Sequence, residues 1–364
     1  MKARALLLLL AVAGCGRGAE PYTIGAAGPW KEGYGVMTRR GIELALDEIN
    51  RSGGVRGSPL RVDARDDQAD PTRAAAIAEG FVADPKILAV VGHVNSGAML
   101  AASRVYDGQL TAVATSASSP DLTGVSPWVF RVISSDSLNG VILGRFANQI
   151  GGRDQLLKRA GVLYENDAYG RGLAGAFRRN FRGTLVTFDP ISPKMEDAET
   201  FVAYLKARQA GIVFVAGREE SALRFLREAR RQQFKAVFVG GDGWQGIVTD
   251  PAAAEGAYVG TSFNADDPRK EVQEFVAAFE KRFRTKPDAF AALSYDATRL
   301  IAKAISERGG KRAGIRDYIA SLGPERPFAG VTGPAYFSAG GDPLGMGFRI
   351  AQVSHGVLTT GSAQ

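Results

Sequence analysis

The chain has 364 residues, and a composition of 45% hydrophobic and 23% charged residues excludes an intrinsically disordered protein. One cysteine excludes an internal disulfide framework and a Cys-based zinc finger, and two histidines, His93 and His355, leave little for a histidine metal site. The formal net charge is +7, but basic residues alternate with acidic ones, as in residues 267–284, so we expect a solvated surface and no nucleic-acid partner.

The N-terminal residues have the layout of a secretory signal. Lys2 and Arg4 precede a short apolar run, and small residues then lead to Cys15. The run is too short for a permanent bilayer span, which needs roughly 20 apolar residues. Small residues before a cysteine resemble the bacterial lipobox, which implies that Cys15 is lipidated and becomes the mature N-terminus. The alternative is an ordinary signal with a chance cysteine nearby. We expect residues 1–20 to be signal peptide and tether.

Apolar runs of strand length then recur, with amphipathic stretches of helical spacing between most of them. The predicted strands are Thr23–Ala27, Leu60–Ala64, Ile87–Val91, Leu110–Ala114, Val129–Ile133, Ala160–Tyr164, Thr184–Phe188, Gly211–Ala216, Ala236–Gly240 and Tyr258–Phe263. Predicted helices include Gly41–Asn50, Phe201–Arg208, Ala222–Arg231 and Val272–Phe283. This alternation predicts an α/β fold with parallel sheets covered by helices on both faces. The length fits two domains at roughly 150 residues each, so we expect two sheets of about five strands.

Two polar segments are candidate crossing points between the domains. At Ser134–Asn139 a predicted strand runs into polar residues, and Asn264–Asp267 follows the last predicted strand. Two crossings imply that residues after 264 complete the N-terminal lobe.

Three strand ends carry residues suited to a small polar ligand, because ligands of open α/β sheets bind beyond the carboxyl ends of the strands. Residues 92–97 lead from a strand into a helix whose free N–H groups can receive a carboxylate, and Ser96 adds a hydroxyl. A simple N-cap is the alternative role of Ser96. Ser116 and Ser118 follow the next strand, where a plain polar turn is the alternative. Asp242 lies between two glycines at a third strand end, and a solvent-exposed loop is the alternative there.

The remaining motifs do not support an enzyme. G-x-G-x-x-G occurs at Gly170–Gly175 and Gly241–Gly246, but the first is separated from its strand and the second places Asp242 where a pyrophosphate would lie. The acidic cluster in residues 63–70 lacks the spacing of a calcium loop, so we expect a turn and a helix cap there. We expect His93 to pack within its loop. With no nucleophile–base pair placed by a motif, we expect no enzyme activity, no cofactor and no metal.

A series of segments then runs through residues 22–350. They are Gly28-Pro29, Tyr34-Gly35, GIELALDEINRSGGVRG, DARDDQADPTRAAAIAEGFV, VVGHVNSGAMLAASRVY, SASSPDLT, VFRVISSDSLNG, YENDAYGRGLAGAF and VFVGGDGWQG. In this order and spacing they resemble the periplasmic leucine/isoleucine/valine-binding protein family, which are type I solute-binding proteins of ABC importers. The resemblance implies two doubly wound parallel-sheet lobes joined by three crossing segments, with the ligand in the cleft. We expect an N-terminal lobe of residues 21–136 and 265–345, and a C-terminal lobe of residues 137–264 and 346–364.

The resemblance also assigns roles to the residues at the strand ends. Ser96 binds the α-carboxylate of an amino acid, Ser116 offers its backbone carbonyl to the ammonium, and Ser118 offers its hydroxyl to the carboxylate. Asp242 pairs with the ammonium, because a buried charge needs an opposite partner. The implied site is therefore a clamp for a zwitterion.

Two aromatic positions complete the implied site, and one segment departs from it. Tyr34 and Tyr169 match positions where the family packs an aromatic ring against the ligand. After the predicted strand Gly211–Ala216, however, Arg218 and Glu219 stand near the place of an aromatic pair in branched-chain binders. Either Glu219 or its neighbour Arg218 faces the cleft and makes the side-chain pocket polar, or both residues begin a helix whose positive end suits acids. The side chain of the ligand thus stays open.

The implied function is that of a lipid-anchored, extracytoplasmic solute-binding protein of an ABC importer. We expect a monomer that closes on an amino acid and docks on a membrane permease. A ligand sensor of the same fold that signals to a regulator is an alternative, and an exported enzyme is a third.

Overall fold

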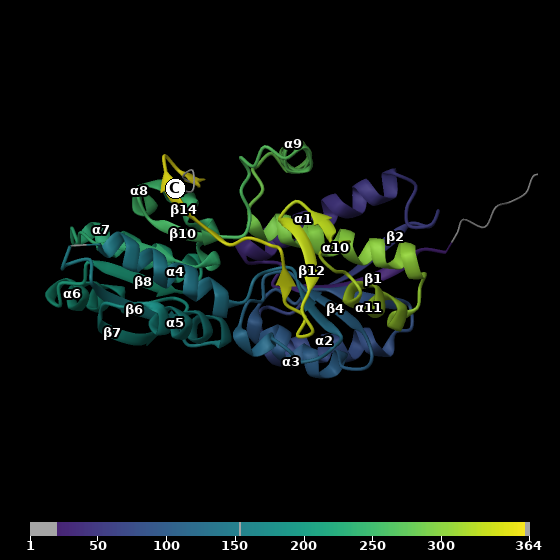
Figure 1. The fold of residues 1–364 in the computed structure, drawn as a ribbon, viewed down its shortest axis with the longest axis horizontal. Helices are drawn as coiled ribbons and strands as arrows, with labels where there is room; N and C mark the ends of the chain where they lie inside the picture. The colour runs from purple at the N-terminus through teal and green to yellow at the C-terminus, as the bar shows by residue number, and fades with distance from the viewer. Residues whose placement is uncertain (1–19, 153, 361–364) are drawn as a thin grey trace, which may run out of the picture.

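A computed structural model describes residues 20–152 and 154–360. The predictions for Cys15 and the signal peptide lie outside these residues. Figure 1 shows two lobes side by side, each built around one sheet. The first lobe contains the N-terminal strands and lies on the right in this view, and the second lobe lies on the left.

The sheet of the first lobe has five parallel strands in the order β2-β1-β3-β4-β5. Its strands are β1 (Tyr22–Gly28), β2 (Leu60–Asp66), β3 (Ile87–Val91), β4 (Thr111–Ala114) and β5 (Val129–Arg131). Both β3 and β4 are buried throughout. Their unbroken apolar sequences fit this position, because the strands of a parallel sheet are covered on both faces.

Helices cover both faces of this first sheet. The helices of residues 20–131 are α1 (Gly33–Arg51), α2 (Pro71–Ala83), α3 (Ser96–Tyr106) and the short 3-10 helix η1 (Pro120–Leu122). In β1, Ala26 packs in the core under α1, whereas its neighbour Ala27 packs in the core under α2 and α3. Successive side chains of a strand point to opposite faces, so one strand serves both cores.

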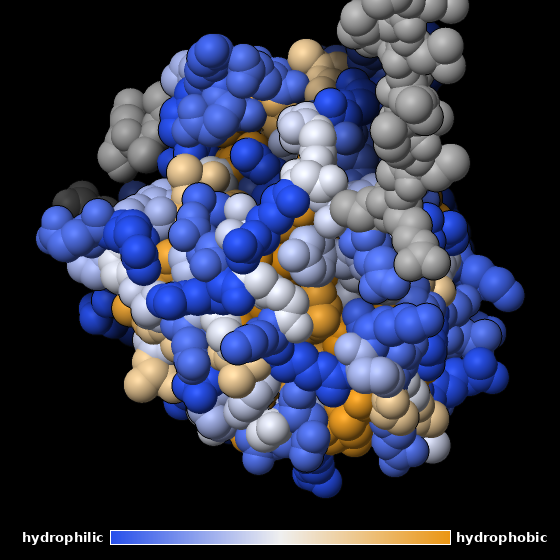
Figure 2. All heavy atoms as spheres, turned by 90° about the vertical axis from the view of Figure 1, so that its right-hand side faces the viewer, coloured by the Kyte–Doolittle hydropathy of each residue, from blue (hydrophilic) through white to orange (hydrophobic). Residues whose placement is uncertain are grey.

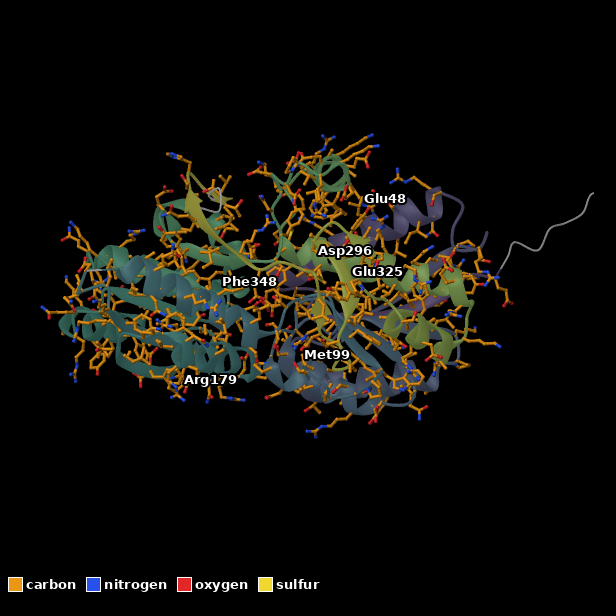
Figure 3. The ribbon with its side chains drawn as sticks, in the orientation of Figure 1. Glu48, Met99, Arg179, Asp296, Glu325 and Phe348 are labelled. Atoms are coloured by element: carbon orange, nitrogen blue, oxygen red, sulfur yellow. The ribbon has the colours of Figure 1, made fainter. Side chains whose placement is uncertain are left out.

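Residues 270–344 return to the first lobe and complete it. They form α9 (Lys270–Phe283), α10 (Ala289–Arg308), α11 (Arg312–Ala320), β11 (Phe328–Gly330), β12 (Gly333–Phe337) and β13 (Pro343–Leu344). α10 is buried on nearly every side, so it lacks the single apolar stripe by which the other helices were predicted. Asp296 of α10, labelled in Figure 3, accepts hydrogen bonds from the N–H groups of Val331 and Thr332 at 2.9 Å each. These bonds tie the small sheet of β11–β13 to α10.

The sheet of the second lobe has seven strands in the order β15-β14-β10-β9-β8-β6-β7. They are β6 (Arg159–Glu165), β7 (Thr184–Ile191), β8 (Ile212–Ala216), β9 (Val237–Gly240), β10 (Tyr258–Thr261), β14 (Arg349–Ser354) and β15 (Val357–Thr359). This sheet is larger than the expected five or so strands, because β14 and β15 add an antiparallel edge. Most residues of both strands are not buried, so they lack the unbroken apolar runs of the central strands.

Helices cover the second sheet as well. They are α4 (Asp136–Gly151), α5 (Ala168–Asn180), α6 (Ala198–Ala207), α7 (Glu219–Arg231), the 3-10 helix η2 (Asp242–Thr249) and α8 (Pro251–Ala254). α4 and α5 pack over one face, where Phe177 stacks on Phe214 of β8 with ring centroids 4.2 Å apart. α6 and α7 pack over the other face.

The chain passes between the lobes three times. The crossings lie between β5 and α4, between β10 and α9, and between β13 and β14. The last one is visible in Figure 1 as the yellow segment that leads to β14. Phe348, labelled in Figure 3, ends this crossing and packs in the core of the second lobe. The predicted architecture of two doubly wound lobes joined by three segments is therefore confirmed, apart from the antiparallel edge.

Hydrophilic side chains predominate on the end of the first lobe shown in Figure 2, with hydrophobic residues scattered among them. Within residues 20–152 and 154–360, no helix combines the length and hydropathy needed to cross a bilayer. Over the same residues, no group of three or more His, Cys, Asp or Glu side chains is placed to hold a metal ion.

Candidate functional site

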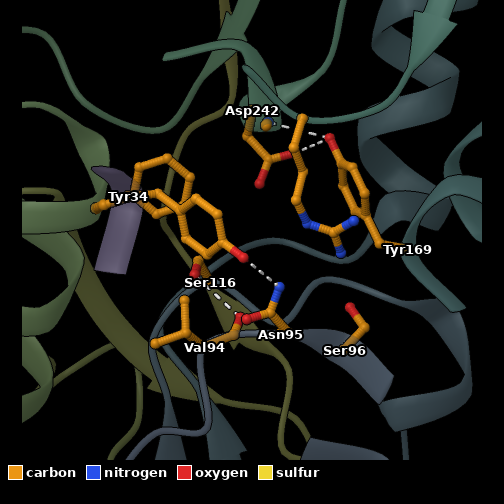
Figure 4. Close-up of a pocket in the computed structure, with 10 residues that line it drawn as sticks. Tyr34, Val94, Asn95, Ser96, Ser116, Tyr169 and Asp242 are labelled. Atoms are coloured by element: carbon orange, nitrogen blue, oxygen red, sulfur yellow. Dashed lines mark hydrogen bonds between the residues drawn. The ribbon is translucent and has the colours of Figure 1, made fainter. Parts of the chain in front are cut away.

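A small pocket lies where the strand ends of the two lobes face each other (Figure 4). Its volume is about 20 Å³, and we call it the inner pocket. The first lobe supplies six of its lining residues, which are Tyr34, Val94, Asn95, Ser96, Ser116 and Phe290. The second lobe supplies four, which are Tyr169, Arg218, Asp242 and Gly243.

Five of the seven predicted site residues line this inner pocket. They are Tyr34, Ser96, Ser116, Tyr169 and Asp242. The structure does not place Ser118 or Glu219 among the lining residues. The three predicted strand ends after β3, β4 and β9 thus meet at one place, although they come from two lobes.

The first-lobe wall is formed by the start of α3 and the end of β4. α3 begins at Ser96, and Asn95 is its N-cap residue without a side-chain capping bond. Ser96 is therefore not the N-cap, and its hydroxyl oxygen accepts a hydrogen bond from the N–H of Ser119 at 3.1 Å. Ser116 donates its hydroxyl to the carbonyl of Val94 at 3.1 Å. The first N–H groups of a helix have no partner within it, so this wall suits an anionic group.

Asn95 is a pocket residue that the sequence interpretation did not single out, although it lies in the motif 92–97. Its Nδ2 donates to the hydroxyl of Tyr34 at 3.0 Å. Its Oδ1 is buried and accepts no hydrogen bond from any residue that the structure describes. Tyr34 in turn packs against Phe290, with ring centroids 5.5 Å apart.

The second-lobe wall presents the carboxylate of Asp242. This residue begins η2 directly after β9 and is only 4% exposed. The hydroxyl of Tyr169 donates to Oδ1 of Asp242 at 3.0 Å and accepts from the N–H of Gly243 at 3.0 Å. Burial raises the pKa of Asp242 to about 6, because it disfavours the charged form. A cation beside Asp242 would favour the charged form of this carboxyl.

Ser118 lies behind the pocket wall and contacts a second buried acid. Its hydroxyl donates to Oδ2 of Asp136 at 3.0 Å, and Asn139 donates to Oδ1 of the same carboxyl at 3.2 Å. Burial, together with the charge of Asp242, raises the pKa of Asp136 well above its usual range. Asp136 is the first residue of α4, at the first crossing between the lobes. The sequence placed a domain change here but did not mark this acid as a neighbour of the site.

Arg218 is the residue of the departing segment that reaches the inner pocket. It stands between β8 and α7, and its guanidinium forms ion pairs with Glu165 and with Oδ2 of Asp167, the latter at 2.7 Å. Burial acts to lower the pKa of Arg218, but the two carboxylates outweigh it and raise the pKa above its usual value. The guanidinium carbon also lies 5.1 Å from the ring centroid of Tyr169.

Glu219 faces a second, larger cavity outside the inner pocket. This outer pocket has a volume of about 700 Å³ and shares Tyr34, Asn95 and Arg218 with the inner one. Glu219 lines it, begins α7, and accepts a hydrogen bond from Thr249 at 3.1 Å. Eight of the sixteen lining residues of the outer pocket are charged.

The other motifs occupy structural positions. Asp70 caps α2 by accepting from the N–H of Arg73 at 2.8 Å. Asp67 contacts Nδ1 of His93 at 2.7 Å, and Nε2 of that histidine lies 3.0 Å from the hydroxyl of Tyr106. His93 is fully buried, in agreement with the expectation of a packing role. In the same acidic cluster, Asp63 pairs with Arg65 at 2.7 Å and Asp66 accepts from the N–H of Gln68 at 3.0 Å, so all four acids have structural contacts.

Fold and site together define a two-lobed binding protein whose pocket is lined from both sides. The sequence model of the family described as "Periplasmic binding protein" matches residues 22–358, and the chain belongs to this family. Its fold is that of the type I periplasmic binding proteins, which are solute-binding proteins and not enzymes. Family membership implies a place outside the cytoplasm.

Individual relatives are similar over most of the chain. An "Amino acid binding protein" of Pseudomonas aeruginosa is 31% identical over 304 residues, which are 79% of this chain and 78% of the relative. A "Leu/Ile/Val-binding protein homolog 1" of Brucella abortus is 28% identical over 318 residues, covering 85% of this chain and 83% of the relative. A solved ABC transporter substrate-binding protein of Desulfitobacterium hafniense in complex with Leu has a TM-score of 0.80 and 30% identity, covering 94% of this chain and all of that one.

Proposed function

We propose that this protein is the lipid-anchored substrate-binding component of an ABC importer and that it binds an amino acid in the inner pocket. The single observation that carries the proposal is the meeting of the α3 start with the buried carboxylate of Asp242 across the two lobes. The relatives described above are named as amino-acid or Leu/Ile/Val binders, or were solved with Leu, and they support the same ligand class.

In this proposal the two ends of a zwitterion bind to opposite lobes. The α-carboxylate lies at the start of α3 beside Ser96, and the ammonium pairs with Asp242 while Ser116 offers its backbone carbonyl. Each charge-assisted hydrogen bond contributes about 1.5–3 kcal/mol. A few such bonds, less the free energy of ordering and closure, give micromolar affinity, or about −8 kcal/mol. The hydroxyl of Ser118 donates to Asp136 in this structure, so it can reach the ligand carboxylate only after it leaves that acid.

Closure follows from this division of the ligand between the lobes. A ligand that touches both walls stabilises the closed arrangement relative to an open one, and the three crossing segments are where such a hinge would bend. The closed form then docks on the permease. Because the inner pocket of about 20 Å³ holds roughly one water molecule, an amino acid must enter while the lobes are further apart or displace lining side chains.

A thermal-shift screen against the standard amino acids tests the proposed ligand class. A true ligand at 100 times its Kd should stabilise the folded protein by about 2.7 kcal/mol and raise its melting temperature. Ligands that lack either the amino or the carboxyl group are the matched controls and should have little effect. If no α-amino acid stabilises the protein while another compound class does, the proposal is wrong.

The pH dependence provides a second test, because the pKa of Asp242 is raised to about 6. Only its charged form pairs with an ammonium, so affinity should be constant at pH 7–8 and fall up to tenfold per pH unit below 6.

The stability of the ligand-free protein depends on pH in the opposite way, because the contribution of Asp242 is larger at low pH. A carboxyl whose pKa is raised on folding stabilises the fold at low pH, and this contribution is lost as the pH rises through about 6.

Calorimetric titration between pH 5 and 8 would measure this dependence. Asp136 and Asp288 also have raised pKa values, so a control is needed to show that the pH dependence of affinity comes from Asp242. The Asp242→Asn variant is this control. The affinity of the variant should vary much less over this range. A wild-type affinity that is equal at pH 5 and pH 7 would contradict a role for ionised Asp242.

The lipid anchor is tested separately from the ligand. We expect fatty-acid label to be incorporated at Cys15 and the mature protein to remain with the membrane fraction. In a Cys15→Ala variant the label should be lost and the protein should move to the soluble fraction. An exported wild-type protein that is soluble and unlabelled would contradict the lipid anchor and support an ordinary signal peptide instead.

A further inference from the structure

The lining residues outside the zwitterion clamp indicate which kind of side chain the ligand carries. If Ser96 and Asp242 hold the two ends of the zwitterion, five polar lining residues remain. The hydroxyls of Tyr34, Ser116 and Tyr169 already bond to protein groups, which leaves Asn95 and Arg218. Both also line the outer pocket. A ligand side chain that extends from the clamp toward the outer pocket would therefore contact them.

Arg218 has N–H groups that are not used in its two ion pairs. Its Nη1 atom serves the ion pairs with Glu165 and Asp167. Its Nε and Nη2 atoms donate to none of the residues that the structure describes, although a guanidinium carries five N–H donors in a fixed fork. A branched aliphatic side chain would cover these donors without bonding to them, which disfavours its binding. The ligand side chain should carry an acceptor.

Asn95, in contrast, needs a hydrogen-bond donor from the ligand. Its Oδ1 is buried and lacks a partner within the described residues, whereas its Nδ2 is held by the hydroxyl of Tyr34 at 3.0 Å. An acceptor left unpaired after the pocket closes is unfavourable, and a donor on the ligand would satisfy it. The ligand side chain should therefore carry a donor as well as an acceptor.

The charges argue that this side chain is neutral. Arg218 already faces two carboxylates, and Glu165 is only 1% exposed and also accepts from the N–H of Arg218 at 2.8 Å. The nearby Asp242 adds a further negative charge, which the ligand ammonium neutralises. Another carboxylate, carried by the ligand, would enter surroundings in which the acids Glu165, Asp167 and Asp242 already outnumber Arg218.

We propose that the ligand is a neutral amino acid with a carboxamide side chain, whose carbonyl accepts from Arg218 and whose NH₂ group donates to Asn95. This inference rests on the proposed function, because it takes the zwitterion clamp as given. The charged lining of the outer pocket agrees with a polar side chain at this end of the ligand. Branched aliphatic amino acids, which the relatives' names suggest, are disfavoured in this chain.

The first experiment compares glutamine, asparagine, glutamate and leucine as ligands of the mature wild-type protein by calorimetry. We expect glutamine or asparagine to bind at least tenfold more tightly than both leucine and glutamate. Tightest binding of leucine would overturn the carboxamide assignment, and tightest binding of glutamate would overturn the argument from charge. Either result would leave the proposed amino-acid function intact. Binding of no α-amino acid at all would overturn both the function and this inference.

Variants of the two polar residues then test the contacts themselves. Asn95→Ala should reduce the affinity for the carboxamide more than that for leucine, so the affinity ratio falls at least fivefold. The double variant Arg218→Met/Glu165→Gln removes the guanidinium together with its buried carboxylate, which avoids an unpaired charge, and should shift the ratio at least tenfold toward leucine. Exposed Asp266→Asn is the control. An unchanged ratio in both folded variants would overturn the inference.

Discussion

Asparagine in place of Asp242 should weaken amino-acid binding at least tenfold. Asp242 is the one acid among the ten described lining residues of the inner pocket, and the substitution removes its charge while keeping nearly the same shape. A hydrogen bond to a charged group contributes about 1.5–3 kcal/mol more than no bond, and about 1.4 kcal/mol corresponds to a tenfold change in affinity. Because the carboxylate is 4% exposed, water cannot replace it in the closed site. Calorimetric titration of both proteins at pH 7.5 would measure the loss.

A matched control separates charge loss at the site from charge loss in general. Asp266 is exposed and lies beyond the lining of both pockets, so Asp266→Asn should bind like the wild type. The hydroxyl of Tyr169 can still donate to the new amide oxygen at position 242, so the fold of the variant should be retained. Equal affinities of wild type and Asp242→Asn would remove this residue from the site.

The Arg218→Met variant should unfold much more easily than the wild type. Its guanidinium is the ion-pair partner of Glu165, whose side chain is 1% exposed. Removing one member of a buried ion pair leaves an uncompensated charge and destabilises a protein by about 3–5 kcal/mol. Arg218→Met/Glu165→Gln removes both charges, and its glutamine can still accept from the hydroxyl of Ser221, which lies 2.8 Å from Glu165. We therefore expect the double variant to regain most of the lost stability.

Urea and thermal unfolding without ligand would measure these differences. The control is Arg224→Met, because Arg224 lies on the neighbouring helix α7 and forms an exposed pair with Glu220 at 3.6 Å. Such exposed pairs contribute about 0–1 kcal/mol, so this variant should unfold close to the wild type. A single Arg218→Met variant as stable as the wild type would contradict the buried ion pair.

The sequence predicted the central strands of both sheets because of their burial. β3 and β8 are buried at every residue, so an unbroken apolar run marks each of them without reference to the rest of the fold. β14 and β15 form the antiparallel end of the second sheet after the chain has returned from the first lobe, and most of their residues are not buried, so no unbroken apolar run marks them. α10 lacks the amphipathic pattern for a different reason, since it is buried on nearly every side.

At the site, the sequence was informative where a residue stands at the end of a buried strand. Ser96, Ser116 and Asp242 follow such strands, and all three line the inner pocket. Ser118 is two residues further along, where its hydroxyl turns to Asp136, a contact across eighteen positions that no local pattern contains. Arg218 and Glu219 are neighbours at the start of α7 but face different cavities. Their orientations depend on Glu165 and Thr249, which lie 53 and 30 positions away.

A crystal structure of the protein with its tightest-binding amino acid would test the two-lobe clamp most directly. The account predicts the ligand ammonium at hydrogen-bond distance, about 2.7–3.2 Å, from the carboxylate of Asp242. It also predicts the α-carboxylate at the start of α3 beside Ser96, so that one molecule touches both lobes. A ligand bound to one lobe alone, or with its ammonium away from Asp242, would contradict the account.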